Sequence, residues 1–547
     1  MSSARTARFG GPKTLVLASI ALLLACLVYF YRLDAAGMLG PDEPRYASIG
    51  REMARSGDWI TPRLWGQPWF EKPALLYWMT GAAFRLGLRP DLAPRLPVAL
   101  CSIVFLGFFW WLLRREFGLP VAWCATLILA TSGAWLGFSQ VGVTDLPMAA
   151  AYTAAVLLAL PWIARGETRG LAAAGALLGV AVLAKGLVPL ALAAPLAGPA
   201  WRHRNLARVL PRLVLPFLAV CLPWYGLCYL RNGPAFLADL IVKQHFSRFA
   251  SDALQHREPW WFYLPVIAGA LLPWTPLVFA TARRGFCRDP RRVFLLLVVL
   301  WGLLLFSASV NKLPGYILPL VPACAILMAL GLGTAADPPE HALSPGKLQL
   351  AAADQPAREK EDNSGRKPWE SRQPEKPRSE AEGFPPPEPP SARFLAPLLA
   401  LCALLLVSFP VAGGILPGAV LAGLSHTPLP GFEWTWLIPL PVAAATWALA
   451  RRRRLAAVTL VACGAALGVL YLKRDVMPEV GRAASARPLW LRVSPESSRV
   501  CVAGIHRNWR YGLNYYSVTP LPDCPAAGRT IRIVQASGHP PELESLH

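Results

Sequence analysis

The chain has 547 residues, of which 54% are hydrophobic and 16% charged, and it carries a formal net charge of +22. This balance excludes an ordinary water-soluble domain of the same length and predicts an all-α polytopic membrane protein. The charge does not indicate nucleic acid as a partner, because the Lys and Arg residues gather in short clusters between apolar runs. That arrangement is the pattern of cytoplasmic loops in membrane proteins.

Apolar runs of about 17 to 22 residues recur along the chain, which is the length that a helix needs to cross a bilayer. With the basic clusters placed in the cytoplasm, we expect about thirteen transmembrane helices, a cytoplasmic N-terminus and an external C-terminus. The run 171–200 begins and ends beside cytoplasmic charges, so it is expected to cross twice with a break near Lys185 and Gly186. The other expected spans are 14–31, 96–113, 120–138, 146–163, 213–230, 263–281, 293–310, 316–334, 394–411, 433–450 and 455–472.

These spans divide the chain into four regions. Residues 1–334 form a transmembrane core with an external loop at 32–95, and residues 394–473 form the last transmembrane helices. Between them, 335–393 is rich in Pro, Glu, Lys and Ser, which predicts a disordered cytoplasmic linker. The region 474–547 has strand-like "RVCVAGI" and "RTIRIVQ" segments, which predict a small external α/β domain.

Two cysteines differ from the rest in their surroundings. Nine of the eleven cysteines lie in apolar runs or in a cytoplasmic loop, where small buried side chains are expected. Cys501 and Cys524 instead fall in the external C-terminal region, which is oxidising in a bacterial envelope. We therefore expect a disulfide between them.

The first external loop contains the stretch "LGPDEPRYASIGREM" at 39–53. Pro44 suits the first turn of a helix, so Asp42 and Glu43 are expected at a helix N-terminus, where carboxylates are stabilised. They could cap the helix or take part in chemistry, and this stretch alone leaves both open. The same loop carries further polar and aromatic residues that lipid contact does not require: Tyr46, Arg63, Trp69 and Tyr77.

The loop then continues with Glu71 and Lys72, followed by Pro73 and an apolar run that is expected to be a helix on the membrane surface. Lys72 could reach toward lipid phosphates in general or hold the phosphate of a substrate. The acid of "SQVGVTDLPMA", Asp145, could be a helix cap or a catalytic group. The external segment 231–262 adds Arg248, His256 and Arg257, but one histidine and one acid are too few ligands to predict zinc.

Four motifs together resemble a known family. They are "DEPRYASIGREMARSGDWITPRLWGQPWFEKPALLYW", "GVTDLPMA", "KQHFSRFASDALQHREPWWFYLP" and "NKLPGYILPL", in this order. They are similar to the bacterial branch of the dolichyl-phosphate-mannose protein mannosyltransferase superfamily, and within it most similar to the lipid A aminoarabinose transferases, over roughly residues 14–335. The resemblance implies the glycosyltransferase C fold, an external active site beneath two interfacial helices, and a polyprenyl-phosphate sugar donor, in bacteria usually undecaprenyl phosphate.

The resemblance also implies roles for individual residues. Asp42 matches the family's catalytic carboxylate and Asp145 its second loop acid, while Lys72 and Arg257 match groups that bind the carrier phosphate. Glu71 and His256 match positions linked with a metal in the aminoarabinose branch. Because relatives in the wider superfamily need no metal, we expect no required cofactor and keep these two as candidate zinc ligands. The expected substrate-binding residues are Glu43, Tyr46, Arg63, Tyr77 and Arg248.

The expected reaction is an inverting sugar transfer through an oxocarbenium-like state. Lys72 and Arg257 would stabilise the departing phosphate, and Asp42 would take a proton from the acceptor or orient it. The expected acceptor is lipid A or a related glycolipid at the bacterial inner membrane. The alternatives are transfer to protein Ser/Thr or to a glycan, and, as another class, a lipid flippase or transporter. The sequence leaves the sugar and the acceptor open.

Overall fold

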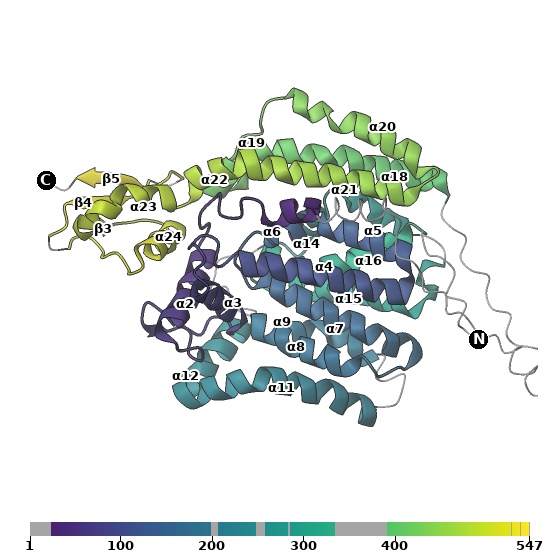
Figure 1. Ribbon diagram of the computed structural model, residues 1–547, viewed down its shortest axis with the longest axis horizontal. Helices are drawn as coiled ribbons and strands as arrows, with labels where there is room; N and C mark the ends of the chain where they lie inside the picture. Colours follow the sequence, from purple (N-terminus) through teal and green to yellow (C-terminus); the bar gives the residue numbers. More distant parts are fainter. Residues whose placement is uncertain are drawn as a thin grey trace, which may run out of the picture.

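The structure is a computed structural model that describes residues 23–198, 206–247, 258–282, 285–333, 391–526, 528–536 and 538–545. Most of its helices lie side by side in one bundle, with their long axes along the horizontal of Figure 1. The expected 335–393 linker, except for its last residues, lies outside the described residues. The longer helices of the bundle are α4 (Leu96–Phe117), α5 (Leu119–Ala130), α7 (Asp145–Arg165), α8 (Leu171–Lys185), α11 (Leu206–Asn232), α15 (Pro290–Ala308), α16 (Val321–Gly331), α18 (Ala392–Leu404), α19 (Ser408–Ala422), α20 (Pro439–Ala450) and α21 (Arg454–Tyr471).

Seven helices among the described residues are long and apolar enough to cross a membrane, or eight if one bent pair counts as a span. The expectation of a mostly helical, multi-pass membrane protein is therefore confirmed at this level. Helix α7 lies at the centre, packed against α4 and α8, because its alanine-rich sequence lets neighbouring helices approach closely. Helix α11 lies at the periphery and exposes leucines such as Leu215 and Leu222, as a lipid-facing helix does.

Three of the expected spans are interrupted. The break expected near Lys185 is present, since α8 ends there, Gly186 has a positive φ of 74°, and α9 (Val188–Leu192) follows. The span expected at 120–138 is instead divided into α5 and α6 (Gly133–Phe138), because the Gly133 N–H bonds to the carbonyl of Leu272. The span expected at 263–281 is bent by 103° between α14 (Tyr263–Ala270) and the 3-10 segment Thr275–Thr281.

Two short helices lie across one end of the bundle. They are α2 (Asp42–Ser56) and α3 (Leu75–Arg85), joined through a hairpin of β1 (Arg63–Leu64) and β2 (Gln67–Pro68). They pack closely because both carry glycine at the contact: a Cβ on Gly50 would lie 2.7 Å from Thr80, and one on Gly81 would lie 3.0 Å from the Gly50 carbonyl. The surface helix that the sequence predicts after Pro73 thus corresponds to α3.

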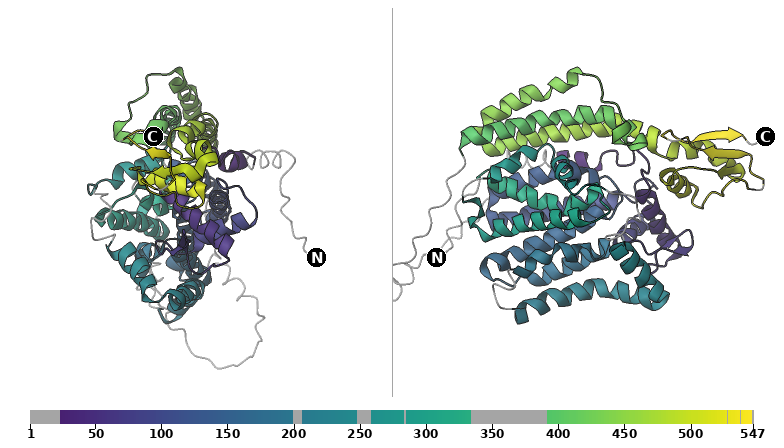
Figure 2. Two further views of the ribbon diagram at one scale, coloured as in Figure 1. Left: turned by 90° about the vertical axis from the view of Figure 1, so that its left-hand side faces the viewer. Right: turned by 180° about the vertical axis from the view of Figure 1, so that it is seen from behind.

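The C-terminal region projects from the same end of the bundle as α2 and α3 (Figures 1 and 2). After α22 (Met477–Ala484) and α23 (Arg487–Val493), it contains a three-stranded sheet with the order β3-β4-β5 and helix α24 (Arg507–Ser517). Strand β3 (Val500–Val502) is parallel to β4 (Ile531–Val534), and β5 (Glu542–Ser545) is antiparallel to β4. The strands β3 and β4 fall within the two segments that read as strands in the sequence.

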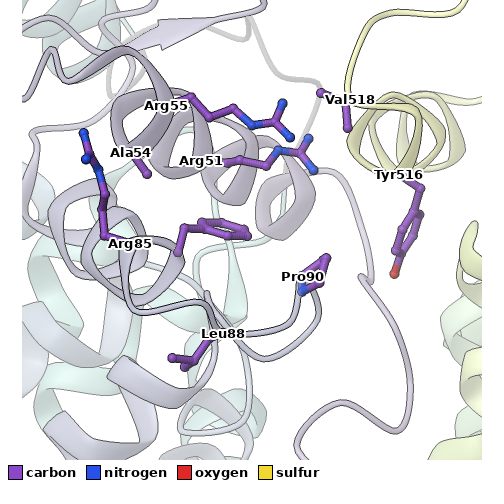
Figure 3. A pocket seen from close by; sticks show the side chains of 9 residues that line it. Arg51, Ala54, Arg55, Arg85, Leu88, Pro90, Tyr516 and Val518 are labelled. Atoms are coloured by element: carbon purple, nitrogen blue, oxygen red, sulfur yellow. The ribbon is translucent and has the colours of Figure 1, made fainter.

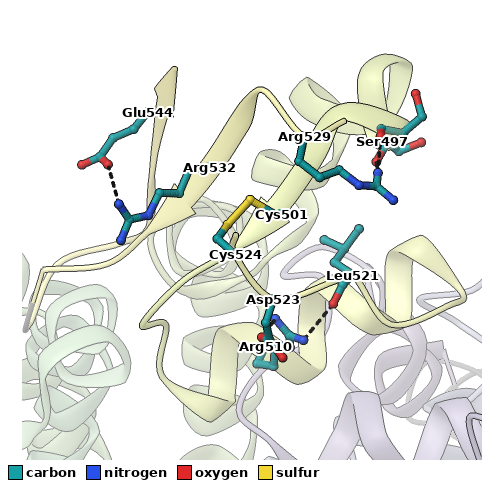
Figure 4. The surroundings of a disulfide bond; sticks show 10 residues. Ser497, Cys501, Arg510, Leu521, Asp523, Cys524, Arg529, Arg532 and Glu544 are labelled. Atoms are coloured by element: carbon teal, nitrogen blue, oxygen red, sulfur yellow. Dashed lines mark hydrogen bonds and ion pairs between the residues drawn. A yellow bond between two sulfur atoms is a disulfide. The ribbon is translucent and has the colours of Figure 1, made fainter. Parts of the chain in front are cut away.

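A disulfide joins Cys501 in β3 to Cys524, with a Cα to Cα distance of 5.3 Å (Figure 4). The pair is the one expected from the sequence. Near it, Arg510 donates to the Leu521 carbonyl and pairs with Asp523 at 3.0 Å, so the loop after α24 is held by both covalent and polar contacts.

Helices α23 and α24 hold the loop before α2 in place. The Tyr516 hydroxyl accepts a hydrogen bond from the Met38 N–H at 2.9 Å and donates one to Asp91 at 2.6 Å. Arg487 pairs with Asp91 at 2.9 Å and donates to the carbonyls of Asp34 and Ala35. The conformation of the loop before α2 therefore depends on residues near the other end of the chain.

Candidate active site

The buried carboxylate of Glu71 is the centre of a polar cluster between α2 and the hairpin. Arg45 donates to its Oε1 at 3.0 Å and places its Nε 2.9 Å from Oε2. The Tyr46 hydroxyl and the Trp69 indole N–H each donate to Glu71 at 3.3 Å, and the Lys72 ammonium lies 3.4 Å away. Two cations and two neutral donors thus share one carboxylate, which fixes the positions of all four side chains.

Asp42 lies at the start of α2 and is the accessible acid of this cluster, with 49% of its side chain exposed. Arg45, one turn further along the helix, bonds to Asp42 Oδ1 at 2.6 Å and so connects Asp42 with Glu71. Burial alone would lower the pKa of Arg45, but the carboxylates, Glu71 first, raise it above its ordinary value. Arg45 therefore stays charged and holds Asp42 with one face open to solvent.

Glu43, the next residue, is 1% exposed and bonded on both oxygens. Arg95 donates to it at 2.7 and 2.6 Å, and the N–H groups of Gly142 and Leu39 donate at 2.9 and 3.2 Å. No side chain caps the N-terminus of α2, whose N-cap residue is Pro41. In this structure the carboxylate of Glu43 is buried against Arg95 and holds α2 against the loop before α7. Its expected contact with substrate stays a prediction.

Asp145 begins α7 and forms an ion pair with Lys185, the last residue of α8, at 2.5 Å. The Lys185 ammonium also lies 5.0 Å from the centre of the Tyr316 ring. Because Gly142 bonds to Glu43, the loop that carries Asp145 is tied to α2. The sequence identified Asp145 but not its partner, although the lysine at a helix break was a visible signal.

The remaining predicted site residues differ in their exposure to solvent, and three of them lie outside the described residues. Tyr46 and Tyr77 are buried, and burial raises the pKa of both hydroxyls, so the phenols stay neutral. Substrate binding by these two side chains stays a prediction. Arg63 is 37% exposed and donates to the Gly66 carbonyl. Arg248, His256 and Arg257 lie outside the described residues.

The described residues contain no group of three or more His, Cys, Asp or Glu side chains that could hold a metal. Glu71, one of the two candidate ligands, is already surrounded by the cations of Arg45 and Lys72. A metal ion at Glu71 would have to displace Arg45 and would meet the repulsion of both charges. The residues present therefore do not fit a metal site centred on Glu71.

Comparisons with known proteins show what this chain is similar to. The family model "Dolichyl-phosphate-mannose-protein mannosyltransferase" matches residues 71–226. The undecaprenyl phosphate-alpha-4-amino-4-deoxy-L-arabinose arabinosyl transferase of Edwardsiella ictaluri is 34% identical over 322 residues, which cover 56% of this chain and 58% of that protein. The enzyme of the same name from Pseudomonas savastanoi pv. phaseolicola is 34% identical over 330 residues, covering 56% and 60%.

The structural similarity covers more of the chain than the sequence similarity does. The crystal structure of ArnT from Cupriavidus metallidurans bound to undecaprenyl phosphate matches with a TM-score of 0.65 and 25% identity, covering 93% of this chain and 86% of that one. Its apo state matches with the same TM-score and 24% identity.

The chain shares the glycosyltransferase C fold with these solved structures, as the sequence motifs implied, and has the apolar helices of a multi-pass membrane protein. Within that class, the resemblance to the undecaprenyl phosphate-aminoarabinose transferases is confirmed. The aligned part of this chain spans less than two thirds of the length of those curated relatives.

Proposed function

We propose that the protein is an inverting glycosyltransferase that moves a sugar from a polyprenyl-phosphate donor, undecaprenyl phosphate being the carrier, to lipid A or a related glycolipid. The observation that carries this proposal is the arrangement at the end of α2. An accessible carboxylate, Asp42, lies beside a buried cluster with two fixed cations, Arg45 and Lys72. The similarity to the named aminoarabinose transferases makes 4-amino-4-deoxy-L-arabinose the first sugar to test.

The proposed chemistry follows from charge development in the transition state. As the bond between sugar and phosphate breaks, positive charge builds on the sugar and negative charge on the departing phosphate. Lys72 supplies a preorganised positive charge for that phosphate, held in place by Glu71. The helix N-terminus and Arg45 favour an ionised Asp42, which accepts the proton of an acceptor hydroxyl or orients an acceptor phosphate.

In this proposal Arg45, which sequence reasoning did not single out, is a positioning residue. Its guanidinium lies 5.3 Å from the centre of the Tyr46 ring and 5.1 Å from that of Tyr511, so aromatic rings and two carboxylates together restrict its position. Asp42 is thereby oriented without being buried, and it keeps room for an acceptor.

The proposal includes a membrane arrangement. We propose about thirteen spans, a cytoplasmic N-terminus, and a periplasmic face that carries α2, α3 and the C-terminal domain at 474–547. In this arrangement the 335–393 linker is cytoplasmic and far from the site. Labelling of single cysteines introduced at 34 and at the exposed position 479 in intact cells tests the orientation, because both should react with a reagent that does not cross the inner membrane.

Purified full-length protein incubated with undecaprenyl-phosphate aminoarabinose and lipid A tests the reaction. We expect release of undecaprenyl phosphate together with lipid A of increased mass. The variant Asp42→Asn should lose transfer by two orders of magnitude or more, since general base catalysis contributes roughly 10²- to 10⁴-fold. Asp34→Asn, at a partly exposed acid of the same loop, is the matched control and should retain activity.

A protein acceptor is the second candidate, favoured by the family model, which is named for protein mannosyltransferases. Mass analysis of lipid A and of secreted proteins from a deletion strain separates the two. Loss of a sugar from secreted proteins with unchanged lipid A would support the second candidate. A flippase would move the lipid without releasing undecaprenyl phosphate, so the release assay also excludes or supports that class.

A further inference from the structure

A pocket of about 360 Å³ opens between α2, α3 and α24 (Figure 3). Three of its lining residues are the arginines Arg51, Arg55 and Arg85, and none of its lining residues is a carboxylate. The rest of the lining is Tyr516 and the apolar residues Ala54, Phe84, Leu88, Pro90 and Val518. The pocket thus combines a concentrated positive charge with an apolar wall.

No acid lines the pocket beside the three guanidinium groups, and the one carboxylate that favours the charge of Arg51 is Glu52 of the same helix. Arg55 and Arg85 are exposed, and neither forms an ion pair within the described part of the chain. Arg51 is buried and fixed, because it donates to the Tyr515 carbonyl at 2.8 Å and lies over the Tyr515 ring at 4.5 Å. Burial lowers the pKa of Arg51, and the charge of Arg55 acts in the same direction. An anion between these side chains would relieve that repulsion.

The pocket is separate from the candidate catalytic group. Arg51 follows Asp42 by nine residues, which is about 14 Å along the helix and close to the opposite helical face. An occupant of the pocket is therefore not the group on which Asp42 acts. The pocket nevertheless lies at one end of the helix bundle, and in the membrane arrangement proposed above this end meets the lipid headgroups.

We propose that this pocket binds the phosphate group of an anionic lipid headgroup. Arg51 and Arg55, whose guanidinium groups point to the same side of the pocket in Figure 3, pair with the phosphate oxygens, since planar guanidinium groups match phosphate geometry. Arg85 points away from them, past Ala54, and adds positive charge at the other edge of the pocket. Phe84 and Leu88 contact the apolar part that follows. The inference goes beyond the proposed function and does not depend on the sugar that is transferred. A bilayer phospholipid and a phosphorylated glycolipid share this chemistry, and the experiment distinguishes them.

The test uses full-length protein in nanodiscs of neutral phosphatidylcholine. Native mass spectrometry measures its binding of three probes: phosphatidic acid, lipid A and inorganic phosphate. We expect the double variant Arg55→Gln/Arg85→Gln to bind at least one lipid about tenfold more weakly or worse, because the charge-assisted contact of Arg55 and the positive charge of Arg85 are both lost. Both residues are exposed, so the variant should fold as the wild type does. Arg89→Gln, an exposed arginine outside the pocket, is the matched control and should bind as the wild type does.

Each outcome decides the proposal. Selective loss of phosphatidic acid binding supports a bilayer phospholipid, and selective loss of lipid A binding supports a phosphorylated glycolipid. Unchanged lipid binding by the double variant overturns the site. Binding of inorganic phosphate as tightly as either lipid overturns the lipid headgroup as the ligand. Because the readout is binding without turnover, an inactive protein that still binds lipid through these arginines would refute the proposed function and leave this inference standing.

Discussion

Neutral substitutions of the two neighbouring acids at the start of α2, Asp42 and Glu43, are expected to have different effects: one on activity and the other on stability. Glu43→Gln leaves the Arg95 guanidinium, which is 3% exposed, without its counter-charge. It also turns one of two acceptors into a donor that faces the N–H groups of Arg95 or of the backbone. Removing one partner of a buried ion pair costs about 3–5 kcal/mol. That is a large share of the roughly 5–15 kcal/mol by which folded proteins are stable.

Asp42→Asn changes a side chain that is half exposed and pairs with Arg45 near solvent. Exposed ion pairs contribute about 0–1 kcal/mol, so this variant should melt close to the wild type. Thermal unfolding in detergent, followed by tryptophan fluorescence, compares the two variants, and release of undecaprenyl phosphate is measured in parallel. We expect Glu43→Gln to melt several degrees lower and Asp42→Asn to lose transfer without losing stability.

A Glu43→Gln protein that melts like the wild type and yet loses transfer would refute this reasoning and place Glu43 in contact with substrate. Should that variant give no folded protein, Arg95→Lys provides a milder test. Lysine keeps the charge but cannot reproduce the forked contact with Glu43, so its melting temperature should fall between those of the wild type and of Glu43→Gln. A melting temperature equal to that of the wild type would contradict the structural role.

Three further predictions concern other parts of the molecule. Asp145→Asn should lower the melting temperature, because it leaves the Lys185 ammonium buried without its partner. The double variant Asp145→Asn/Lys185→Met should recover part of that loss. Equal melting temperatures of the single and double variants would argue against a stabilising ion pair. Replacing Cys501 and Cys524 by serine should destabilise the C-terminal domain by about 3 kcal/mol, because the disulfide closes a loop of 23 residues. The expected readout is faster proteolysis of this domain. An unchanged rate of proteolysis would show that the disulfide is dispensable. Dialysis against EDTA should leave transfer unchanged because Glu71 is held by cations; loss of activity that zinc restores would contradict this.

The apolar runs predicted the positions of most helices because hydropathy is a local property. The break after α8 was also predictable, since a lysine followed by glycine interrupts an apolar run. The break between α5 and α6 was not, because it depends on a hydrogen bond from Gly133 to Leu272, which is distant in sequence. Local sequence patterns therefore predict where the helices lie. They predict a break in a helix only where the residue types at the break, such as lysine followed by glycine, indicate it.

The same distinction applies to the site. The loop with Asp42, Glu71 and Lys72 was identifiable, because charged residues at the mouth of membrane helices need an explanation. The pairing of Glu43 with Arg95, 52 residues away, was not identifiable, since nothing local shows which arginine will face a given acid. This pairing is also what separates the two neighbouring acids, because it buries one and leaves the other accessible.

The contacts of α23 and α24 with the loop before α2 bear on when this loop becomes ordered during synthesis of the chain. Residues 34 and 38 are synthesised about 450 and 480 residues ahead of the side chains that hold them, Arg487 and Tyr516. At about 5–20 residues per second, the loop waits roughly 20 to 100 s for these partners. A nascent or truncated chain that ends before α24 therefore has the acids and bases around α2 but lacks the contact of Tyr516 with the preceding loop. Maturation of the candidate site is in this way coupled to completion of the last segment of the chain, so unfinished chains are not expected to carry out the proposed transfer.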